Sequence, residues 1–139
     1  MKFWDSSAIL PLLLEEKISA PLLGLLHADP AVIVWCLSEV EIESGIARRM
    51  REGLATEDEK SARSRLRLLA ERWNEVVCID PVRKRANRLL RSHPLSAAGS
   101  LQLAAALICC EERPEELGFV CLDERLSDAA LREGFTILP

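Results

Sequence analysis

Three acidic residues stand where strands are expected to give way to helices, and acids at such places can hold a metal ion. Asp5 directly follows a short apolar run, and Asp123 follows another at 118–122. Glu41 lies in the first turn of the helix expected after a third apolar run, 31–35. Because ligands gather outside the carboxyl ends of strands in open α/β sheets, Asp5 and Asp123 should converge if their strands are neighbours. Glu41 would then point from the same rim.

Such a group of carboxylates predicts a particular chemistry. Three negative charges on one rim repel one another unless a cation lies between them. Oxygen ligands suit Mg²⁺ or Mn²⁺ better than zinc, and Mg²⁺ keeps several waters that substrate phosphate oxygens can replace. The ion can deprotonate a water and stabilise charge on the leaving oxygen. The arrangement therefore predicts phosphodiester hydrolysis.

Each acid also has a purely structural interpretation. Asp5 can be no more than part of a strand-to-helix turn in which Ser6 or Ser7 caps the helix. Glu41 can be the acid of a capping box that begins at Ser38, since it follows that serine by three residues. Loss of such a cap costs roughly 1 kcal/mol, so selection for stability alone could place a glutamate there.

The elements that must position these acids alternate along the chain. Strand patterns alternate with helix patterns without an internal repeat, which predicts a mainly parallel sheet between helical layers in a single domain, residues 1–139. The helix over 95–110 is apolar around most of its circumference and belongs in the middle of the domain. Strands are expected before Asp5, at 31–35, at 76–79, before Asp123 and at 135–138. Helices are expected over 7–14, 17–28, 38–50, 56–73, 81–90, 95–110 and 126–131.

The composition is that of a soluble globular chain. Its 139 residues are 49% hydrophobic and 29% charged. No apolar run is long enough to span a membrane, and an acid at position 5 is unlike a secretory signal, so a cytoplasmic protein is expected. The five cysteines are odd in number and show no C-x-x-C spacing, which predicts buried thiols in a reducing compartment. Only two histidines are present, which argues against a zinc site.

Charge is distributed unevenly along the chain. The net charge is −4, but residues 48–91 hold 13 of the 18 Lys and Arg residues and only 7 of the 22 acids, a local balance of +6. The asymmetry indicates an anionic partner near the basic part and cation binding near the acidic part. Solvated helix faces would account for much of it as well.

Several segments, in order, make the chain resemble a PIN domain, and specifically the VapC-type toxins of toxin–antitoxin pairs. They are D-S-S-A at 5–8, Glu41 followed by E-S-G-I-A-R-R at 43–49, H-P-L-S-A-A-G-S-L-Q-L-A-A-A-L at 93–107 and F-V-C-L-D-E-R-L at 119–126. The resemblance covers essentially the whole chain. It implies a compact three-layer α/β/α ribonuclease that uses Mg²⁺ or Mn²⁺, cuts single-stranded regions of RNA, forms a homodimer and is silenced by a cognate antitoxin protein.

The same resemblance assigns roles to individual residues. Asp5, Glu41 and Asp123 would be metal ligands and catalytic acids, with Glu41 either a ligand or the group that orients the attacking water. The remaining candidates would contact the RNA, although an ordinary surface role is open for each arginine. They are Ser6, Arg48, Arg49 and Arg125.

Gly99 departs from the family pattern, which usually has an aspartate at this position. The change removes one charge and one oxygen from the acidic group, and glycine costs about 1 kcal/mol relative to alanine in a helix. Ser100, Glu124 and Asp128 are near in sequence but not convincingly placed to substitute. We expect weakened metal binding and weakened activity.

Two other functions are compatible with the sequence. Gly99 motivates a catalytically silent PIN-fold protein that only binds an antitoxin or dimerises, with helices 7–14 and 17–28 forming the groove. A phospho-accepting receiver-like domain would also place an acid at a strand end. That chemistry needs paired acids near the first strand and a late lysine, and no lysine follows Lys84.

Overall fold

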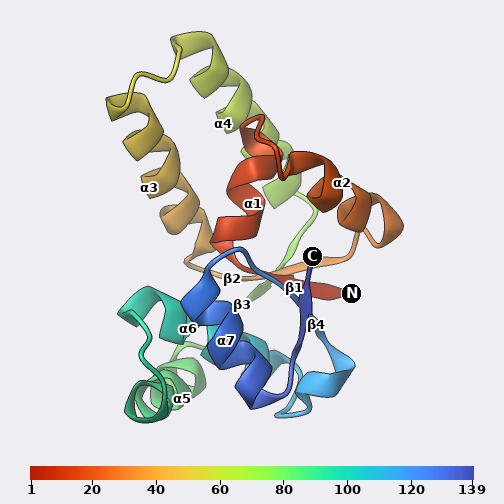
Figure 1. Cartoon of the computed structure of the whole chain (residues 1–139), viewed down its shortest axis with the longest axis vertical. Helices are drawn as coiled ribbons and strands as arrows, with labels where there is room; N and C mark the ends of the chain where they lie inside the picture. The colour runs from red at the N-terminus through yellow and green to blue at the C-terminus, as the bar shows by residue number, and fades with distance from the viewer.

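The computed structural model describes residues 1–139 and contains a five-stranded parallel sheet between two layers of helices (Figure 1). This confirms the predicted three-layer α/β/α architecture. The strand order is β3-β2-β1-β4-β5 and every pair is parallel. The strands are β1 (Lys2–Trp4), β2 (Val32–Trp35), β3 (Asn74–Val76), β4 (Gly118–Val120) and β5 (Thr136–Leu138).

The helices divide between the two faces of the sheet, with α1 to α4 on one side and α5 to α7 on the other (Figure 1). None of them combines the length and apolar character needed to cross a membrane. Their bounds are α1 (Ser6–Leu13), α2 (Ser19–Ala28), α3 (Ser38–Arg51), α4 (Thr56–Ala70), α5 (Ile79–Ser92), α6 (Ala97–Cys109) and α7 (Glu124–Glu133), and a 3₁₀ turn covers Pro114–Glu116.

The hydrophobic core consists of two clusters, one on each face of the sheet, because side chains along the central strand β1 alternate in direction. Successive strand side chains point to opposite faces, so neighbouring residues of β1 enter different clusters. Phe3 joins the cluster under α5 to α7 and stacks on Phe119 of β4, with ring centroids 5.5 Å apart. Trp4 joins the cluster under α1, α3 and α4 together with Val34 and Val120. Burial on both faces explains why these short strands are continuously apolar.

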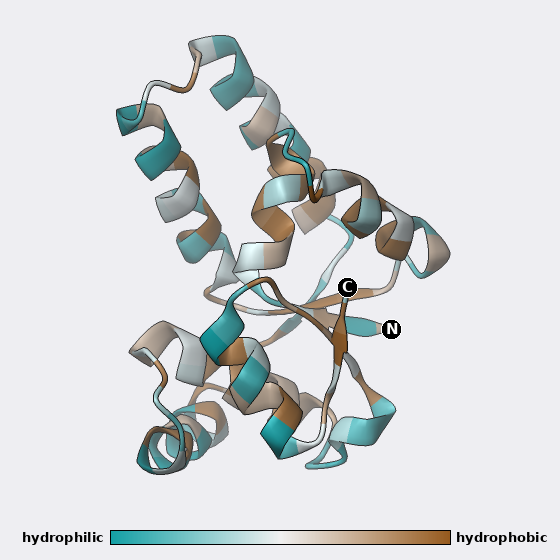
Figure 2. Ribbon diagram, viewed as in Figure 1, coloured by the Kyte–Doolittle hydropathy of each residue, from teal (hydrophilic) through white to brown (hydrophobic).

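Helix α6 lies inside the lower layer, as its composition predicts. Every residue from Gln102 to Leu107 is buried, and the helix packs against α5, α7 and β2. Hydrophobic residues in Figure 2 concentrate on the sheet and on the helix faces turned toward it, whereas the outer ends of α3 and α4 are hydrophilic. Because α6 is closely packed, its first turn has a defined position beside the carboxyl ends of the strands.

The hairpin of α3 and α4 projects beyond the sheet (Figure 1). Its turn includes Gly53 at φ 103°, a left-handed conformation that glycine adopts without strain. Arg63 of α4 forms ion pairs with Glu43 of α3 and Glu59 of its own helix. An ion pair therefore connects the two helices in addition to their packing contacts.

Three local predictions are wrong. The third strand is Asn74–Val76, not 76–79, because its ladder to β2 ends where Trp35 pairs with Val76. Helix α5 accordingly begins at Ile79, two residues before the predicted start. Of the five cysteines predicted to be buried, only Cys121 is: Cys78, in the intervening turn, is exposed, and the other three are partly buried.

Candidate active site

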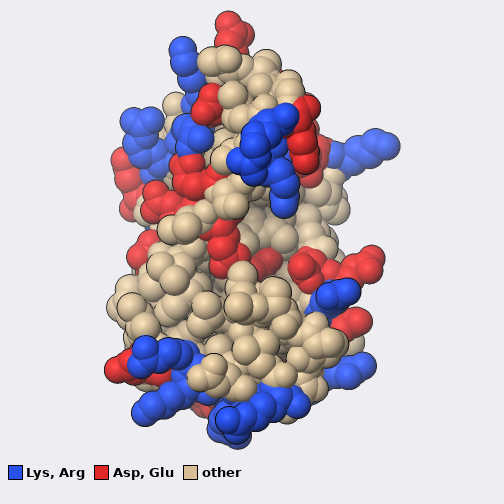
Figure 3. All heavy atoms as spheres, turned by 90° about the vertical axis from the view of Figure 1, so that its left-hand side faces the viewer, with Lys and Arg blue, Asp and Glu red and all other residues tan.

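A pocket of about 510 Å³ opens where the carboxyl ends of the central strands meet the starts of four helices, α1, α3, α6 and α7. The predicted acids Asp5, Glu41 and Asp123 all line it. Asp5 and Asp123 come together because β1 and β4 are neighbours, with Trp4 paired to Val120. Acidic side chains are visible in the waist between the two helical layers in Figure 3.

Asp5 is the most deeply buried of the three acids, at 3% exposure. Its Oδ2 accepts a 2.9 Å hydrogen bond from the backbone N–H of Ser7, so Asp5 itself caps α1. The prediction that Ser6 or Ser7 caps this helix is therefore wrong. Burial raises the pKa of the Asp5 carboxyl, hydrogen bonds from Ser7 oppose that rise, and the nearby charge of Asp123 adds to it.

A second layer of contacts surrounds Asp5. The Sγ of Cys121 lies 3.8 Å from Asp5 Oδ2, and the hydroxyl oxygen of Ser7 accepts a 3.0 Å hydrogen bond from the N–H of Leu122. Burial, aided by the charge of Asp5, raises the pKa of the Cys121 thiol to about 12. The thiol therefore stays protonated and neutral beside the carboxylate.

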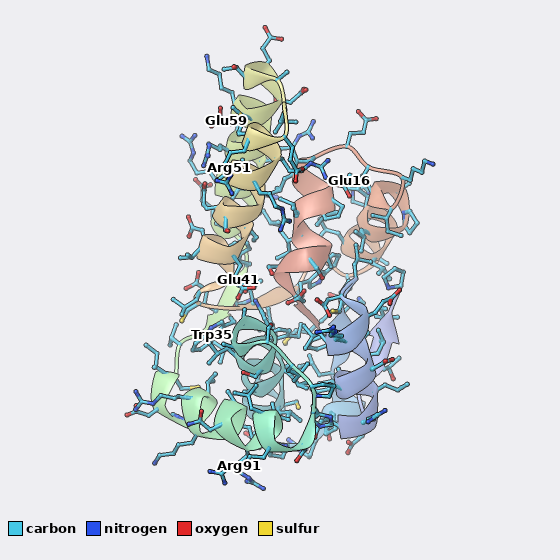
Figure 4. The ribbon with its side chains drawn as sticks, turned by 60° about the vertical axis from the view of Figure 1, so that its left-hand side comes forward. Glu16, Trp35, Glu41, Arg51, Glu59 and Arg91 are labelled. Atoms are coloured by element: carbon cyan, nitrogen blue, oxygen red, sulfur yellow. The ribbon has the colours of Figure 1, made fainter.

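Glu41 lies at the base of α3, above α6 (Figure 4). Its two oxygens accept hydrogen bonds from Ser6 Oγ at 2.9 Å and from Gln102 Nε2 at 3.1 Å. Burial raises the pKa of Glu41, and the charge of Asp5 raises it further, although the bond from Ser6 opposes this. The capping-box prediction is wrong, because Ser38 makes no cap: its Oγ instead accepts a 2.9 Å bond from Gln102.

Asp123 is the exposed member of the acidic group. Its Oδ1 caps α7 by accepting a 2.8 Å bond from the N–H of Leu126, and the residue also lines the pocket. Asp5 and Asp123 are thus both helix caps and pocket residues. A capping role therefore does not exclude a functional role for either acid.

The candidate RNA-contacting residues divide between the pocket and the outer surface. Ser6 and Arg48 line the pocket. Arg49 instead pairs with Glu16 at 3.0 Å, and Arg125 is exposed on α7 and does not line the pocket. The structure therefore brings only the first two of these candidates to the acids.

Gln102 is a site residue that the sequence reasoning missed. It is fully buried, and its Nε2 connects Ser38 of α3 to Glu41 one helical turn later. The sequence did contain an indication of its role, since Gln102 is the only residue with a side-chain amide in the mostly apolar α6. Its partners are more than sixty residues away in sequence, so nothing local indicated its role.

Replacing Gln102 with leucine is expected to raise the pKa of Glu41. The Gln102 N–H stabilises the charged form of the carboxylate, and an apolar replacement both removes that bond and adds to the desolvation. A carbon-detected NMR titration of the glutamate carboxyl groups measures the change. Leu107→Met, a similar-sized change in the same buried helix, serves as the control. A Glu41 titration unchanged by loss of Gln102 would contradict the expectation.

Gly99 lines the pocket as the third residue of α6. A Cβ at this position would lie 3.2 Å from Ser96 Oγ and no closer than 3.9 Å to any other neighbouring atom. Of the nearby polar residues, Ser100 bonds the carbonyl of Ala97, and neither Glu124 nor Asp128 lines the pocket. The space beside Gly99, where the family resemblance leads us to expect an aspartate, is therefore open, and neither of these two carboxylates occupies it.

The donor set fits a hard divalent cation that retains much of its water. Asp5, Glu41 and Asp123 take part in no ion pair, and the charge of Asp5 interacts with each of the other two. Carboxylate oxygens are the ligands that Mg²⁺ and Mn²⁺ prefer. No three acidic, histidine or cysteine side chains converge tightly enough to form a complete ligand set, however, so protein ligands would be few.

Comparisons with known proteins agree with this architecture. The profile of the family described as "PIN domain" matches residues 2–132. A search of curated proteins found no match. Among solved structures, FitAcB from Neisseria gonorrhoeae superposes with a TM-score of 0.68 at 16% identity, covering 100% of this chain and 97% of that one.

Two further structures show the same fold. A toxin–antitoxin complex from Klebsiella pneumoniae has a TM-score of 0.63 at 14% identity, with 91% of each chain covered. FitAB bound to an IR36 DNA fragment has a TM-score of 0.65 at 15% identity, covering 99% of this chain and 94% of that one. With the family profile matched over nearly the whole chain, the protein belongs to the PIN domain family.

Proposed function

We propose that this protein is a Mg²⁺- or Mn²⁺-dependent endoribonuclease toxin that cuts single-stranded regions of RNA in the cytoplasm. It acts as a homodimer and is silenced by an antitoxin. The observation that carries the proposal is that Asp5, Glu41 and Asp123 line one pocket and that none of them takes part in an ion pair. Membership of the PIN family and the toxin–antitoxin identity of a structural neighbour support it.

The residues divide the work of hydrolysis. Asp5 and Asp123 hold the cation, and Glu41, oriented by Ser6 and Gln102, is a further ligand or positions the attacking water. A bound divalent ion supplies charge neutralisation for the phosphate and a lowered pKa for water. Arg48, at the wall of the same pocket, contacts an RNA phosphate.

Cleavage of RNA that contains single-stranded loops tests the proposal. Purified protein and its Gly99→Asp variant are incubated with the RNA in MnCl₂, with EDTA as the control, and the new ends are mapped. We expect chelator-sensitive cuts in the loops, weak for the natural protein. If neither protein cuts and neither binds Mn²⁺ by isothermal titration, the nuclease proposal fails.

A groove on the other side of α1 favours a second function, that of a non-catalytic partner-binding module. It has a volume of about 750 Å³ and lies between α1, α2 and α4. Leucines such as Leu12, Leu23 and Leu68 line it, and Arg65 and Arg72 flank it. We propose that an apolar segment of the antitoxin with acidic side chains docks here, whether or not the pocket is active.

Charge introduced into the groove should abolish that docking. The double variant Leu23→Asp, Leu68→Asp would bury two carboxylates against the partner. Substitutions at the centre of an interface can reduce the binding free energy by about 2 kcal/mol or more. Co-expression with each neighbouring gene, followed by titration of the purified pair that forms, measures the loss. Leu131→Asp, an equally polar change at an exposed leucine of α7, should have no effect. Equal binding by both variants would place the partner elsewhere.

A further inference from the structure

Helix α5 carries a stripe of cations on its exposed outer face. Lys84, Arg88 and Arg91 follow one another at helical spacings of four and three residues, so they lie on one face. All three are exposed, and none takes part in an ion pair. We call these three residues the α5 stripe.

Within α5, the stripe is the set of cations that form no ion pair. The other arginines of α5 are paired, Arg83 with Asp80 and Arg85 with Glu112 and Glu133. No acid occurs from residue 81 to residue 110, so α5 and α6 supply no counter-charge of their own. The α3–α4 hairpin, residues 38–70, by contrast holds seven acids beside its seven Lys and Arg residues.

The stripe lies within reach of the acidic pocket. Arg91 precedes the pocket-lining residue Ser96 by five residues, and five extended residues span at most about 18 Å. Helix α5 also packs along α6, whose third residue, Gly99, lines the pocket. Basic side chains gather along the lower edge of the face in Figure 3, below the acidic waist, and Figure 4 places Arg91 at that lower edge.

We propose that the α5 stripe binds the phosphates of an RNA strand that extends from the pocket past Ser96, so that the preferred substrate is longer than the pocket holds. The inference rests on the proposed nuclease function. Successive stripe residues are about 6 Å and 4.5 Å apart along the helix axis, which gives a linear array of charge. Guanidinium groups match phosphate oxygens with paired hydrogen bonds, and lysine binds them as a point charge.

A lipid headgroup would present similar phosphate chemistry, but the stripe lacks what a membrane surface requires. Interfacial helices bury an apolar face in the lipid. Most of the apolar face of α5 is instead turned inward, where Val82, Ala86 and Leu89 are buried against α6. The exposed large hydrophobic residues of α5 are Ile79 and Leu90, which lie about 16 Å apart along the helix axis and form no continuous apolar face. A nucleic acid strand needs no such anchor.

Binding is measured in EDTA, so that no cleavage takes place. Fluorescence anisotropy follows a labelled four-nucleotide and a labelled twelve-nucleotide oligouridylate over a range of salt concentrations. The stripe variant combines Lys84→Gln, Arg88→Gln and Arg91→Gln. The matched control, Arg51→Gln with Lys60→Gln and Arg67→Gln, removes three exposed, unpaired cations from the α3–α4 hairpin.

We expect the stripe variant to bind the longer oligonucleotide about 10- to 100-fold more weakly and the shorter one unchanged. The slope of log affinity against log salt should fall by about 2 for the longer strand, since each phosphate contact contributes about 0.7. The control variant should resemble the natural protein. Equal weakening by both variants, or equal weakening for both lengths, would overturn the inference.

Two further outcomes separate this inference from the nuclease proposal. A protein that cuts RNA in Mn²⁺ but binds the longer strand equally well without the stripe refutes the inference alone. A protein that binds the longer strand through the stripe but never cuts refutes the nuclease proposal alone. Loss of binding to phosphatidylserine vesicles in the stripe variant, with RNA binding unchanged, would assign the stripe to a membrane and overturn the inference.

Discussion

Gly99→Asp is expected to bind Mn²⁺ at least 10- to 100-fold more tightly than the natural protein and to cut RNA correspondingly faster. The substitution adds a carboxylate to a pocket whose other acids already lack cationic partners. Loss of a residue that only hydrogen-bonds a metal ligand commonly reduces metal affinity or activity 10- to 100-fold. Adding a direct ligand should therefore have an effect at least as large.

The fold can accept this substitution. Only Ser96 Oγ lies closer than 3.9 Å to a Cβ at position 99, and that serine can shift as its cap rearranges. An acid at the third position of α6 is also favourable for the helix dipole, and replacing glycine removes a helix-destabilising residue. We therefore expect the variant to fold, which its far-ultraviolet circular dichroism and thermal unfolding would verify.

Isothermal titration with MnCl₂ and loop-cleavage rates measure the effect. Gly99→Asn is the matched control, because it has nearly the same shape and adds an oxygen without the charge. We expect most of the gain in the aspartate variant alone. Equal affinity in the two variants would mean that charge at this position does not contribute to a metal site.

Asp5→Asn is expected to reduce metal-dependent cleavage at least 100-fold while making the folded protein more stable at neutral pH. Asp5 is the acid whose charge interacts with both Glu41 and Asp123, so its loss removes the centre of the group. The asparagine side-chain oxygen can still accept the Ser7 N–H bond and cap α1. The helix start should therefore be preserved.

The gain in stability follows from the direction of the pKa shift. Burial raises the pKa of Asp5, so the folded chain binds this proton more tightly than the unfolded chain does. The unfolding free energy then decreases as pH rises from the usual aspartate range through the raised pKa, so ionisation of the buried Asp5 carries a cost that is already present at neutral pH. Asparagine carries no charge and avoids this cost.

Urea unfolding at pH 4 and pH 7.5, together with cleavage assays, measures both effects. The difference in unfolding free energy between Asp5→Asn and the natural protein should be larger at the higher pH. Asp128→Asn, at an exposed aspartate of α7 outside the pocket, should change neither property. Unchanged cleavage by the Asp5 variant would remove this residue from the catalytic group.

Much of the architecture was predictable because it depends on local periodicity. The apolar strands and the buried α6 both follow from residues near one another in sequence. Boundaries were less predictable: β3 is only Asn74–Val76, because pairing with β2 rather than apolar character determines where it ends. Ser38 followed the sequence pattern of a cap, but its hydroxyl bonds Gln102 instead.

By itself, the sequence determined that acids stand at strand ends and that the basic residues concentrate in the middle of the chain. Only the tertiary structure decided which of these residues meet. The adjacency of β1 and β4 brings Asp5 to Asp123, and the packing of α6 against α3 gives Glu41 its partner Gln102. The physical reason is that helix and strand patterns depend on neighbours a few residues away, whereas the charge, burial and hydrogen bonds of a site depend on elements that only the folded chain brings together.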